Sequence, residues 1–111
     1  MRVLQSAAIM AEKDGISCEI IDLRTVYPWD YEIVRNSVKK TGKVIVSHEA
    51  PLTCGLGAEI SAKIVEDCFL YLNAPIKRVC GYDTPFNHIF EPLYYPDRYK
   101  VYEAIKETML Y

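Results

Sequence analysis

The stretch that decides the fold is Lys43-Val-Ile-Val-Ser-His-Glu-Ala-Pro-Leu-Thr-Cys-Gly-Leu-Gly-Ala-Glu59. It opens with a run of β-branched residues, which is typical of a strand buried on both faces of a parallel sheet. The polarity then reverses, Pro51 and Gly55 break the backbone, and an apolar period of three to four residues begins at Ile60. This order predicts a central strand over 43–48, followed by a loop and a helix.

The sequence on either side continues the alternation of helices and strands. Apolar residues recur at helical spacing from Val3 to Ala11, and Asp14-Gly15 is a stop signal, so the first predicted element is a helix. The other predicted elements are strands over 16–23 and 76–81, a helix over 30–40 capped by Asp30 and closed by Gly42, a helix over about 57–72, and a terminal helix capped by Asp97. Together they predict a single three-layer α/β/α domain over residues 1–111, with a mainly parallel sheet.

Helical periodicity also predicts which side chains form the core. The apolar faces comprise Ile33, Val34 and Val38; then Ile60, Ile64, Val65, Cys68, Phe69 and Leu72; and finally Val101, Tyr102, Ile105 and Met109.

Composition and charge exclude several classes of protein. Half of the 111 residues are apolar and a quarter are charged, as in one globular domain. The net charge of −2 gives no electrostatic reason to expect a nucleic-acid partner. No apolar run approaches the roughly 18 residues of a membrane span, and no targeting segment is recognised. We therefore expect neither nucleic acid nor membrane as a partner.

The cysteines, at positions 18, 54, 68 and 80, include no C-x-x-C pair. Four cysteines could form a disulfide framework in a secreted protein. However, Cys18 and Cys80 fall in predicted strands and Cys68 falls on an apolar helix face, where cysteine behaves as a small hydrophobic residue. The sequence therefore predicts thiols in a reducing compartment.

Two motifs that could carry chemistry are incomplete. Gly55-Leu56-Gly57 begins like a dinucleotide-binding fingerprint, but Ile60 stands where the third glycine belongs. The glycines could still expose amides to an anion, or simply permit a tight turn. His48-Glu49 does not continue as H-E-x-x-H, and neighbours along a strand point to opposite faces, so they form no triad. No catalytic, cofactor-binding or metal-binding residue is predicted.

The segment 82–95 is rich in aromatic residues and proline. A loop of this length with no secondary structure of its own is usually functional or disordered, and its aromatic content argues against disorder. Two interpretations remain open. Phe86, Ile89 and Phe90 could close the core, or Phe86 and Phe90 could join Tyr94 and Tyr95 in an aromatic protein interface.

Several blocks resemble a known family. They are Ile21-Asp-Leu-Arg-Thr25, Pro28-Trp-Asp30, Ser47-His-Glu-Ala-Pro-Leu-Thr53, Arg78-Val-Cys-Gly-Tyr-Asp-Thr-Pro-Phe86 and His88-Ile-Phe-Glu-Pro92. These blocks resemble the C-terminal domain of the beta subunit of branched-chain 2-oxo acid dehydrogenase. That subunit belongs to the thiamin diphosphate-dependent decarboxylating component, and the domain to the transketolase C-terminal-like family.

The resemblance implies a function for the whole enzyme: oxidative decarboxylation of branched-chain 2-oxo acids, with the acyl group passed to a lipoyl-bearing acyltransferase. Thiamin diphosphate and magnesium are then held by the alpha subunit and the N-terminal part of beta, and this domain is inactive alone. The implied location is the mitochondrial matrix in a eukaryote and the cytoplasm in a bacterium. Alternatives are the beta subunit of a pyruvate or other 2-oxo acid dehydrogenase, a free-standing α/β binding protein, and an independent nucleotide-binding domain.

The resemblance also implies partners and the residues that meet them. Expected partners are the alpha subunit, a second beta subunit, and the peripheral subunit-binding domain of the acyltransferase core. The subunit interface is expected to use His48, Glu49, Asp83, Phe86, His88 and Phe90. Core docking is expected to use Asn73, which stands where relatives often carry an acidic residue, and the carboxylate of Tyr111.

The same resemblance predicts an N-terminal strand that is absent from this sequence. In the family it lies between the strands that correspond to 16–23 and 43–48. Unpaired strand edges are costly and invite association. We therefore expect either that these two strands pair directly, which places 43–48 in the middle of three parallel strands, or that an exposed edge pairs with another copy of the chain.

Overall fold

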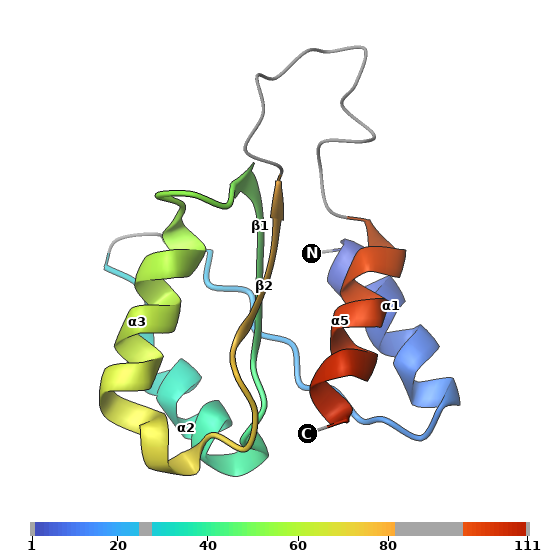
Figure 1. Cartoon of the computed structure of the whole chain (residues 1–111), viewed down its shortest axis with the longest axis horizontal. Helices are drawn as coiled ribbons and strands as arrows, with labels where there is room; N and C mark the ends of the chain where they lie inside the picture. The colour runs from blue at the N-terminus through green and yellow to red at the C-terminus, as the bar shows by residue number, and fades with distance from the viewer. Residues whose placement is uncertain (1, 25–27, 82–96, 111) are drawn as a thin grey trace.

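The fold is a small parallel sheet between two layers of helices, as Figure 1 shows. The computed structural model describes residues 2–24, 28–81 and 97–110. In chain order the elements are α1 (Arg2–Lys13), α2 (Tyr31–Thr41), β1 (Ile45–Pro51), α3 (Leu56–Cys68), the 3-10 helix η1 (Phe69–Tyr71), β2 (Lys77–Gly81) and α5 (Arg98–Met109). The helices α2 and α3 cover one face of the sheet, and α1 and α5 cover the other. The predicted three-layer α/β class is therefore confirmed.

Local sequence signals fix the helix ends where they were predicted. Asp30 caps α2 by accepting a hydrogen bond from the backbone N–H of Ile33, and Gly42 closes that helix in the left-handed conformation at φ 75°. Asp97 caps α5 in the same way, through the N–H of Lys100. The helix predicted over 57–72 is α-helical only to Cys68, after which η1 adds one tighter turn.

The two strands run parallel and in register over most of their length. Ile45 pairs with Lys77, and Ser47 pairs with Val79, before the register shifts ahead of the pairing of Pro51 with Gly81. Strand β1 therefore carries extra residues near its end, as in a β-bulge. The shift follows Ser47, where the segment 43–59 changes from apolar to polar residues.

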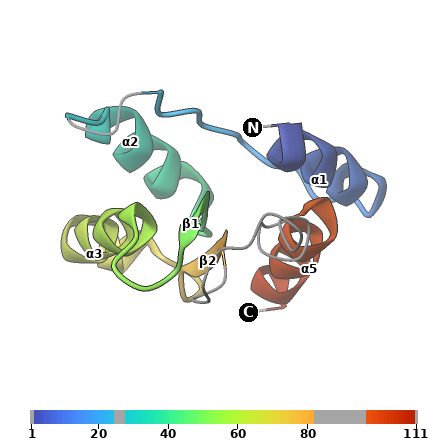
Figure 2. The same cartoon turned by 90° about the horizontal axis from the view of Figure 1, so that it is seen from above.

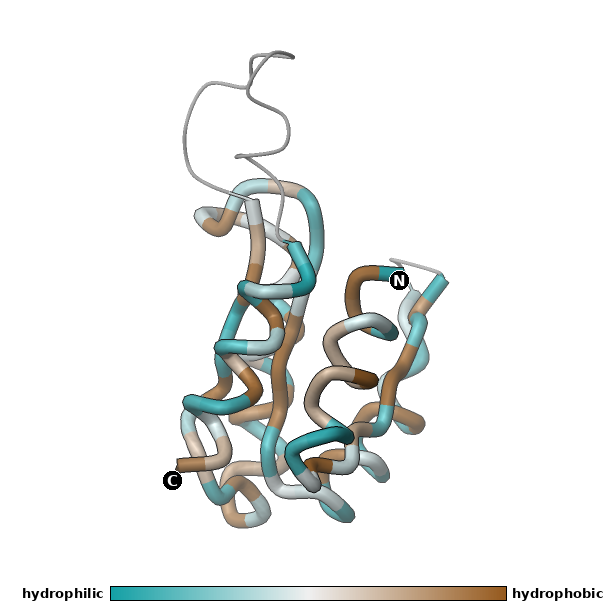
Figure 3. The backbone as a smooth tube through the Cα atoms, turned by 90° about the vertical axis from the view of Figure 1, so that its right-hand side faces the viewer, coloured by the Kyte–Doolittle hydropathy of each residue, from teal (hydrophilic) through white to brown (hydrophobic). Residues whose placement is uncertain are grey.

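Two clusters of apolar side chains form the core, one on each face of the sheet. The first joins α2 and α3 through Val34, Val38, Ile60, Ile64 and Cys68. The second joins α1 and α5 through Ala7, Ala11, Val101 and Ile105. Figure 3 shows hydrophobic positions recurring at intervals along the helices, as amphipathic helices require.

Four predicted core residues are instead exposed. The side chains of Ile33, Val65, Phe69 and Met109 are 53%, 44%, 67% and 47% exposed. Each helix buries only a narrow stripe in its cluster, and apolar residues at the margin of that stripe face outward in this small domain. Phe69 lies in η1, beyond the end of α3.

The strand predicted over 16–23 is wrong, and so is its predicted pairing with 43–48. Among the described residues, no backbone hydrogen bond joins this segment to β1, and the sheet contains only β1 and β2. Figure 2 shows the segment passing from α1 to α2 beside the sheet. Side chains hold it there: Ile21 and Leu23 pack against the α2–α3 cluster, and Glu19 forms a 3.0 Å ion pair with Lys40. Pairing with another copy stays a prediction.

The cysteines follow the prediction only in part. Cys68 is buried and Cys80 is half-buried, but Cys18 is exposed because the segment 16–23 forms no strand. Cys54 is also exposed, and none of the four forms a disulfide. In the described ranges, no helix is long and apolar enough to cross a lipid bilayer.

Candidate functional site

The carboxyl ends of β1 and β2 meet in a junction held by polar contacts. Leu52, just after β1, donates its N–H to the carbonyl oxygen of Gly81 at 3.0 Å. The Leu52 carbonyl in turn accepts a hydrogen bond from Arg78 Nη1 at 3.1 Å. A turn follows in which Cys54 has φ 58°, and α3 begins at Leu56. The carboxyl ends of strands are where ligands usually bind in open α/β sheets.

An imidazole and a thiol face each other across this junction. His48 Nε2 lies 3.3 Å from Cys80 Sγ, and His48 Nδ1 lies 3.0 Å from the carbonyl oxygen of Ala50. Because a carbonyl only accepts, the Nδ1–H of neutral His48 donates to Ala50, which leaves the Nε2 lone pair directed at Cys80. A thiol with a neighbouring base that a third group orients is the arrangement of an activated nucleophile.

Two glycines make room for the imidazole. A Cβ atom on Gly55 would lie 2.7 Å from His48 Cε1, and one on Gly57 would lie 2.9 Å from His48 Nε2. The structure adds a role that was not among the two expected, since the backbone of both glycines packs closely against the His48 ring.

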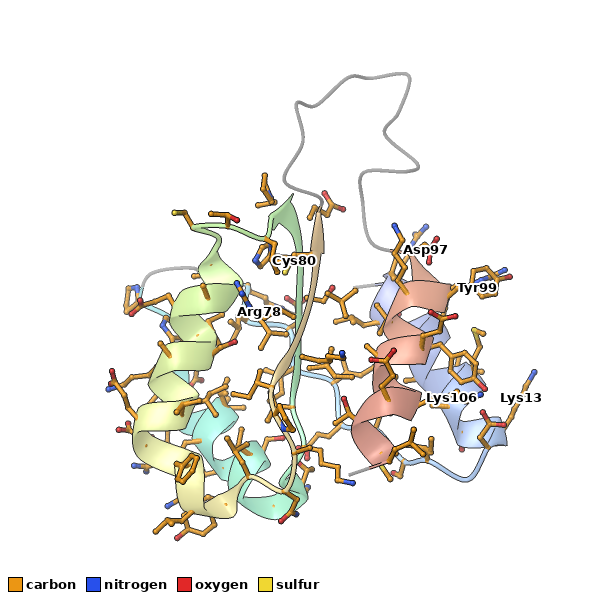
Figure 4. All side chains as sticks on the ribbon, viewed as in Figure 1. Lys13, Arg78, Cys80, Asp97, Tyr99 and Lys106 are labelled. Carbon is orange, nitrogen blue, oxygen red and sulfur yellow. The ribbon has the colours of Figure 1, made fainter. Side chains whose placement is uncertain are left out.

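Charged residues lie on the elements that carry or adjoin the pair. Arg78 is exposed on the same strand as Cys80, and Figure 4 shows both side chains on the side of β2 that faces α3. Glu49, next to His48, and Glu59, in the first turn of α3, are exposed. Within the described ranges, no group of three or more His, Cys, Asp or Glu residues could hold a metal ion.

The residues expected at interfaces lie at two ends of the sheet. His48 and Glu49 are in β1 at the carboxyl end, whereas Asn73 lies beyond the opposite end, shortly before β2. The remaining expected residues fall outside the described part of the chain; these are Asp83, Phe86, His88, Phe90 and Tyr111. The structure therefore separates Asn73 from His48 and Glu49.

The surroundings of Asn73 are ordered and partly apolar. Its N–H donates to the carbonyl oxygen of Gly42 at 2.7 Å, which ties the end of η1 to the end of α2. The neighbouring turn exposes Phe69 and, at 92%, Leu70. The last turns of α5 reach the same end of the sheet, where Glu107 forms a 2.7 Å ion pair with Lys77.

Cys80 is the residue that the sequence analysis missed as a chemical group. It was interpreted as a small hydrophobic residue in a strand, and 32 residues separate it from His48. The available signal was that both residues stand near the ends of predicted neighbouring parallel strands, whose carboxyl ends meet at one edge of the sheet.

Comparison with known proteins assigns the family. Residues 1–101 match the family described as "Transketolase, C-terminal domain". The chain belongs to the transketolase C-terminal domain family. The match covers the α2–α3 cluster, the sheet, the His48–Cys80 junction and the α1–α5 cluster except Ile105. The family that the sequence blocks resemble is therefore confirmed.

Two curated relatives match the whole chain. One is the mitochondrial 2-oxoisovalerate dehydrogenase subunit beta of Dictyostelium discoideum, 66% identical over 112 residues that make up 30% of that protein. The other is the mitochondrial 2-oxoisovalerate dehydrogenase subunit beta 2 of Arabidopsis thaliana, 56% identical over 111 residues that make up 31% of it. The chain thus spans about a third of the length of these relatives.

A solved structure shares the fold. It is described as a split-gene transketolase in an inactive beta4 tetramer, and it superposes with a TM-score of 0.79 over 97% of this chain and 35% of its own. At 24% sequence identity, this likeness concerns the fold alone.

Proposed function

We propose that the chain acts as the C-terminal assembly domain of the beta subunit of a branched-chain 2-oxo acid dehydrogenase. The observation that carries this proposal is the 66% identity to a 2-oxoisovalerate dehydrogenase beta subunit over the full length of the chain. In this role the domain completes the beta subunit and contacts the alpha subunit and a second beta subunit. The reaction itself, oxidative decarboxylation of a branched-chain 2-oxo acid, belongs to the whole enzyme.

The described residues do not fit thiamin diphosphate or magnesium. A diphosphate could be held by the backbone amides at the start of α3, but the His48 ring lies against Gly55 and Gly57 at that point. No cluster of metal-ligating side chains occurs in the described part. We therefore assign the cofactor and its metal to the alpha subunit and the N-terminal part of beta.

Each end of the sheet is suited to a different partner. The carboxyl end, with His48 and Glu49, is assigned to the subunit interface together with the segment 82–95. The opposite end, with Asn73 beside the exposed Leu70, is assigned to the subunit-binding domain of the acyltransferase. Exposed apolar side chains beside polar ones are typical of protein interfaces. In a eukaryote such a complex lies in the mitochondrial matrix, and both curated relatives are named mitochondrial.

A chimeric subunit tests the proposal. The matching 112 residues of the Dictyostelium discoideum beta subunit are replaced by this chain, and the chimera is co-expressed with its alpha subunit. We expect a tetramer of two alpha and two beta subunits that decarboxylates 2-oxoisovalerate, as the unmodified enzyme does. A chimera that folds but does not bind the alpha subunit contradicts the proposal.

The docking assignment is tested on the same chimera. The subunit-binding domain of the acyltransferase is titrated into the chimeric enzyme and into its Asn73→Asp variant. Because relatives often carry an acidic residue here, we expect the added carboxylate to strengthen binding, and to do so less at high salt. An unchanged affinity contradicts the placement of the docking surface at Asn73.

A further inference from the structure

We infer that Cys80 is a reactive thiol, activated by His48, that exchanges with anionic low-molecular-weight disulfides such as glutathione disulfide. This modification site goes beyond the assembly function. It lies at the end of the sheet that the proposed function assigns to the subunit interface, so the exchange concerns the chain while it is not assembled with the alpha subunit. The pair is held at hydrogen-bond distance, with 3.3 Å between His48 Nε2 and Cys80 Sγ. Cys80 is only half-buried, unlike Cys68, whose side chain is 0% exposed in the core.

The imidazole is fixed in the orientation that exchange requires. Its Nδ1–H is committed to the carbonyl oxygen of Ala50 at 3.0 Å, so Nε2 is the ring atom that can accept the proton of Cys80. The close approach of Gly55 and Gly57 restricts rotation of the ring away from the sulfur. A neighbouring His that can take up the proton favours the thiolate, which is the nucleophilic form of cysteine.

Among the described residues, a cationic side chain on the same strand as the sulfur suits an anionic partner. Arg78 precedes Cys80 by two residues on β2, so the two side chains share one face of the strand with Cα atoms about 6 to 7 Å apart. Figure 4 shows both on the side toward α3. The exposed acidic residues on β1 and α3 are Glu49, Glu59, Glu66 and Asp67, of which the last two lie in the final turn of α3, at the end away from this junction. The guanidinium is tied to this junction by its bond to the Leu52 carbonyl, which keeps a positive charge near the thiol.

The exchange step balances without any further reactant. Nε2 of His48 takes the proton from Cys80 Sγ, and the thiolate attacks one sulfur of glutathione disulfide. The new bond between Cys80 Sγ and that sulfur forms as the bond between the two glutathione sulfurs breaks. The departing glutathione thiolate takes the proton from the Nε2–H of the imidazolium. Cys80 is thereby oxidised to a mixed disulfide, and one glutathione is released in its reduced form.

Thiol-specific mass spectrometry tests the inference on the whole 111-residue chain. The chain is incubated with glutathione disulfide between pH 6 and 9, and the rate of mixed-disulfide formation is followed at each cysteine. Cys54 is the internal control, since it is exposed on the turn before α3. We expect Cys80 to react faster than Cys54 at pH 7, and to keep its reactivity at lower pH than Cys54 does.

Three variants identify the groups that make Cys80 reactive and selective. His48→Asn keeps an N–H donor for the Ala50 carbonyl but removes the base, so the rate at Cys80 should fall at least about tenfold while the rate at Cys54 is unchanged. Arg78→Gln should remove the preference of Cys80 for glutathione disulfide over cystamine, a cationic disulfide. Circular dichroism and a thermal melt check that each variant is folded, and His48→Gln serves as a second base-free variant.

The outcomes are decisive in either direction. A Cys80 that reacts no faster than Cys54 at pH 7 overturns the inference. So does a folded base-free variant in which Cys80 reacts as fast as it does in the unmodified chain. A rate at Cys80 that is the same for glutathione disulfide and cystamine in the unmodified chain overturns the assignment to anionic disulfides.

Discussion

The hydroxyl of Tyr31 donates a hydrogen bond of 2.5 Å to Asp67 Oδ2 and thereby joins the start of α2 to the end of α3. Lys63 reinforces the contact, since its Nζ lies 3.5 Å from Asp67 Oδ2 and 5.1 Å from the centre of the Tyr31 ring. The Tyr31 hydroxyl holds the pKa of the Asp67 carboxyl below its usual value, with Lys63 adding to the effect. Loss of solvation, followed by the bond to Asp67, raises the pKa of Tyr31.

These opposite shifts predict a pH window in which the contact stabilises the fold. A lowered carboxyl pKa contributes stability above the unfolded value, near 3.8, and the contribution is lost as the pH falls through the lowered value. A raised tyrosine pKa contributes below the unfolded value, near 10, and this contribution is lost as the pH rises through the raised value. Tyr31→Phe should therefore lower the melting temperature at pH 7, and by less toward pH 2 or pH 12.

Tyr99→Phe is the matched control for this prediction. The Tyr99 hydroxyl bonds the neighbouring Arg98 at 3.0 Å, and its side chain is 56% exposed, so its loss should leave the melting temperature unchanged at every pH. Calorimetric melts of the three proteins across the pH range provide the measurement. An equal effect of both substitutions, or a difference that is independent of pH, contradicts the assigned role of Tyr31.

Adjacent residues of α3 should differ sharply in their contribution to folding. Ile64 is fully buried in the α2–α3 cluster, whereas Val65 is 44% exposed. Ile64→Ala should reduce the free energy of unfolding by about 2 to 5 kcal/mol, because it leaves a cavity that the helices cannot fully close. Val65→Ala should change it by less than about 0.5 kcal/mol. Urea titrations measure both, and similar losses at the two positions would show that the α2–α3 cluster is not the core.

Features that depend on a few neighbouring residues were predictable from the sequence. The caps at Asp30, Gly42 and Asp97 lie where they were expected, because a cap needs only a side chain or a glycine next to a helix end. The strand β2 was predicted within one residue, at 76–81 against Lys77–Gly81.

Features that depend on distant partners were not predictable from the sequence. A strand exists only where another strand pairs with it, and the β-branched sequence of 16–23 cannot reveal that β1 offers it no backbone hydrogen bonds. The His48–Cys80 contact depends on the register between β1 and β2, which local patterns do not encode. For the same reason, the role of Gly55 beside the His48 ring became clear only in the folded chain.

Two glycines with the same backbone conformation should respond differently to alanine. Gly15 has φ 80° and Gly42 has φ 75°, so alanine is strained at either position by about 1 to 2 kcal/mol. A Cβ atom on Gly15 would meet nothing within 4 Å, whereas one on Gly42 would lie 2.3 Å from Asn73 Nδ2 and 3.1 Å from the Tyr71 carbonyl oxygen. Gly42→Ala should therefore be the more destabilising of the two.

A double-mutant cycle isolates the contact with Asn73. Removing that side chain with Asn73→Ala should recover part of the cost of Gly42→Ala, while leaving the cost of Gly15→Ala unchanged. Denaturant midpoints of the five variants give the coupling energy. A coupling of zero between positions 42 and 73 contradicts the close contact at the end of α2.

The chain alone should not bind thiamin diphosphate. The expected reason is that His48 covers the glycines at the start of α3 and that the described residues offer no metal cluster. Isothermal titration of the 111-residue chain with thiamin diphosphate and magnesium should give no saturable heat. The co-expressed enzyme from the chimera experiment is the positive control. A saturable heat with micromolar affinity for the chain alone contradicts the prediction.

The aromatic residues Phe86 and Phe90 lie outside the described part of the chain, so the choice between core and interface rests on experiment. If Phe86 and Phe90 are interface anchors, replacing either with alanine should weaken assembly with the alpha subunit and leave the melting temperature of the chain unchanged. As core residues, each should cost about 3 to 5 kcal/mol of folding stability. Phe69→Ala controls for the loss of an exposed phenylalanine, since Phe69 is 67% exposed near Asn73. Measuring assembly and stability on the same variants separates the alternatives, because a loss of stability without a loss of assembly is compatible only with the core.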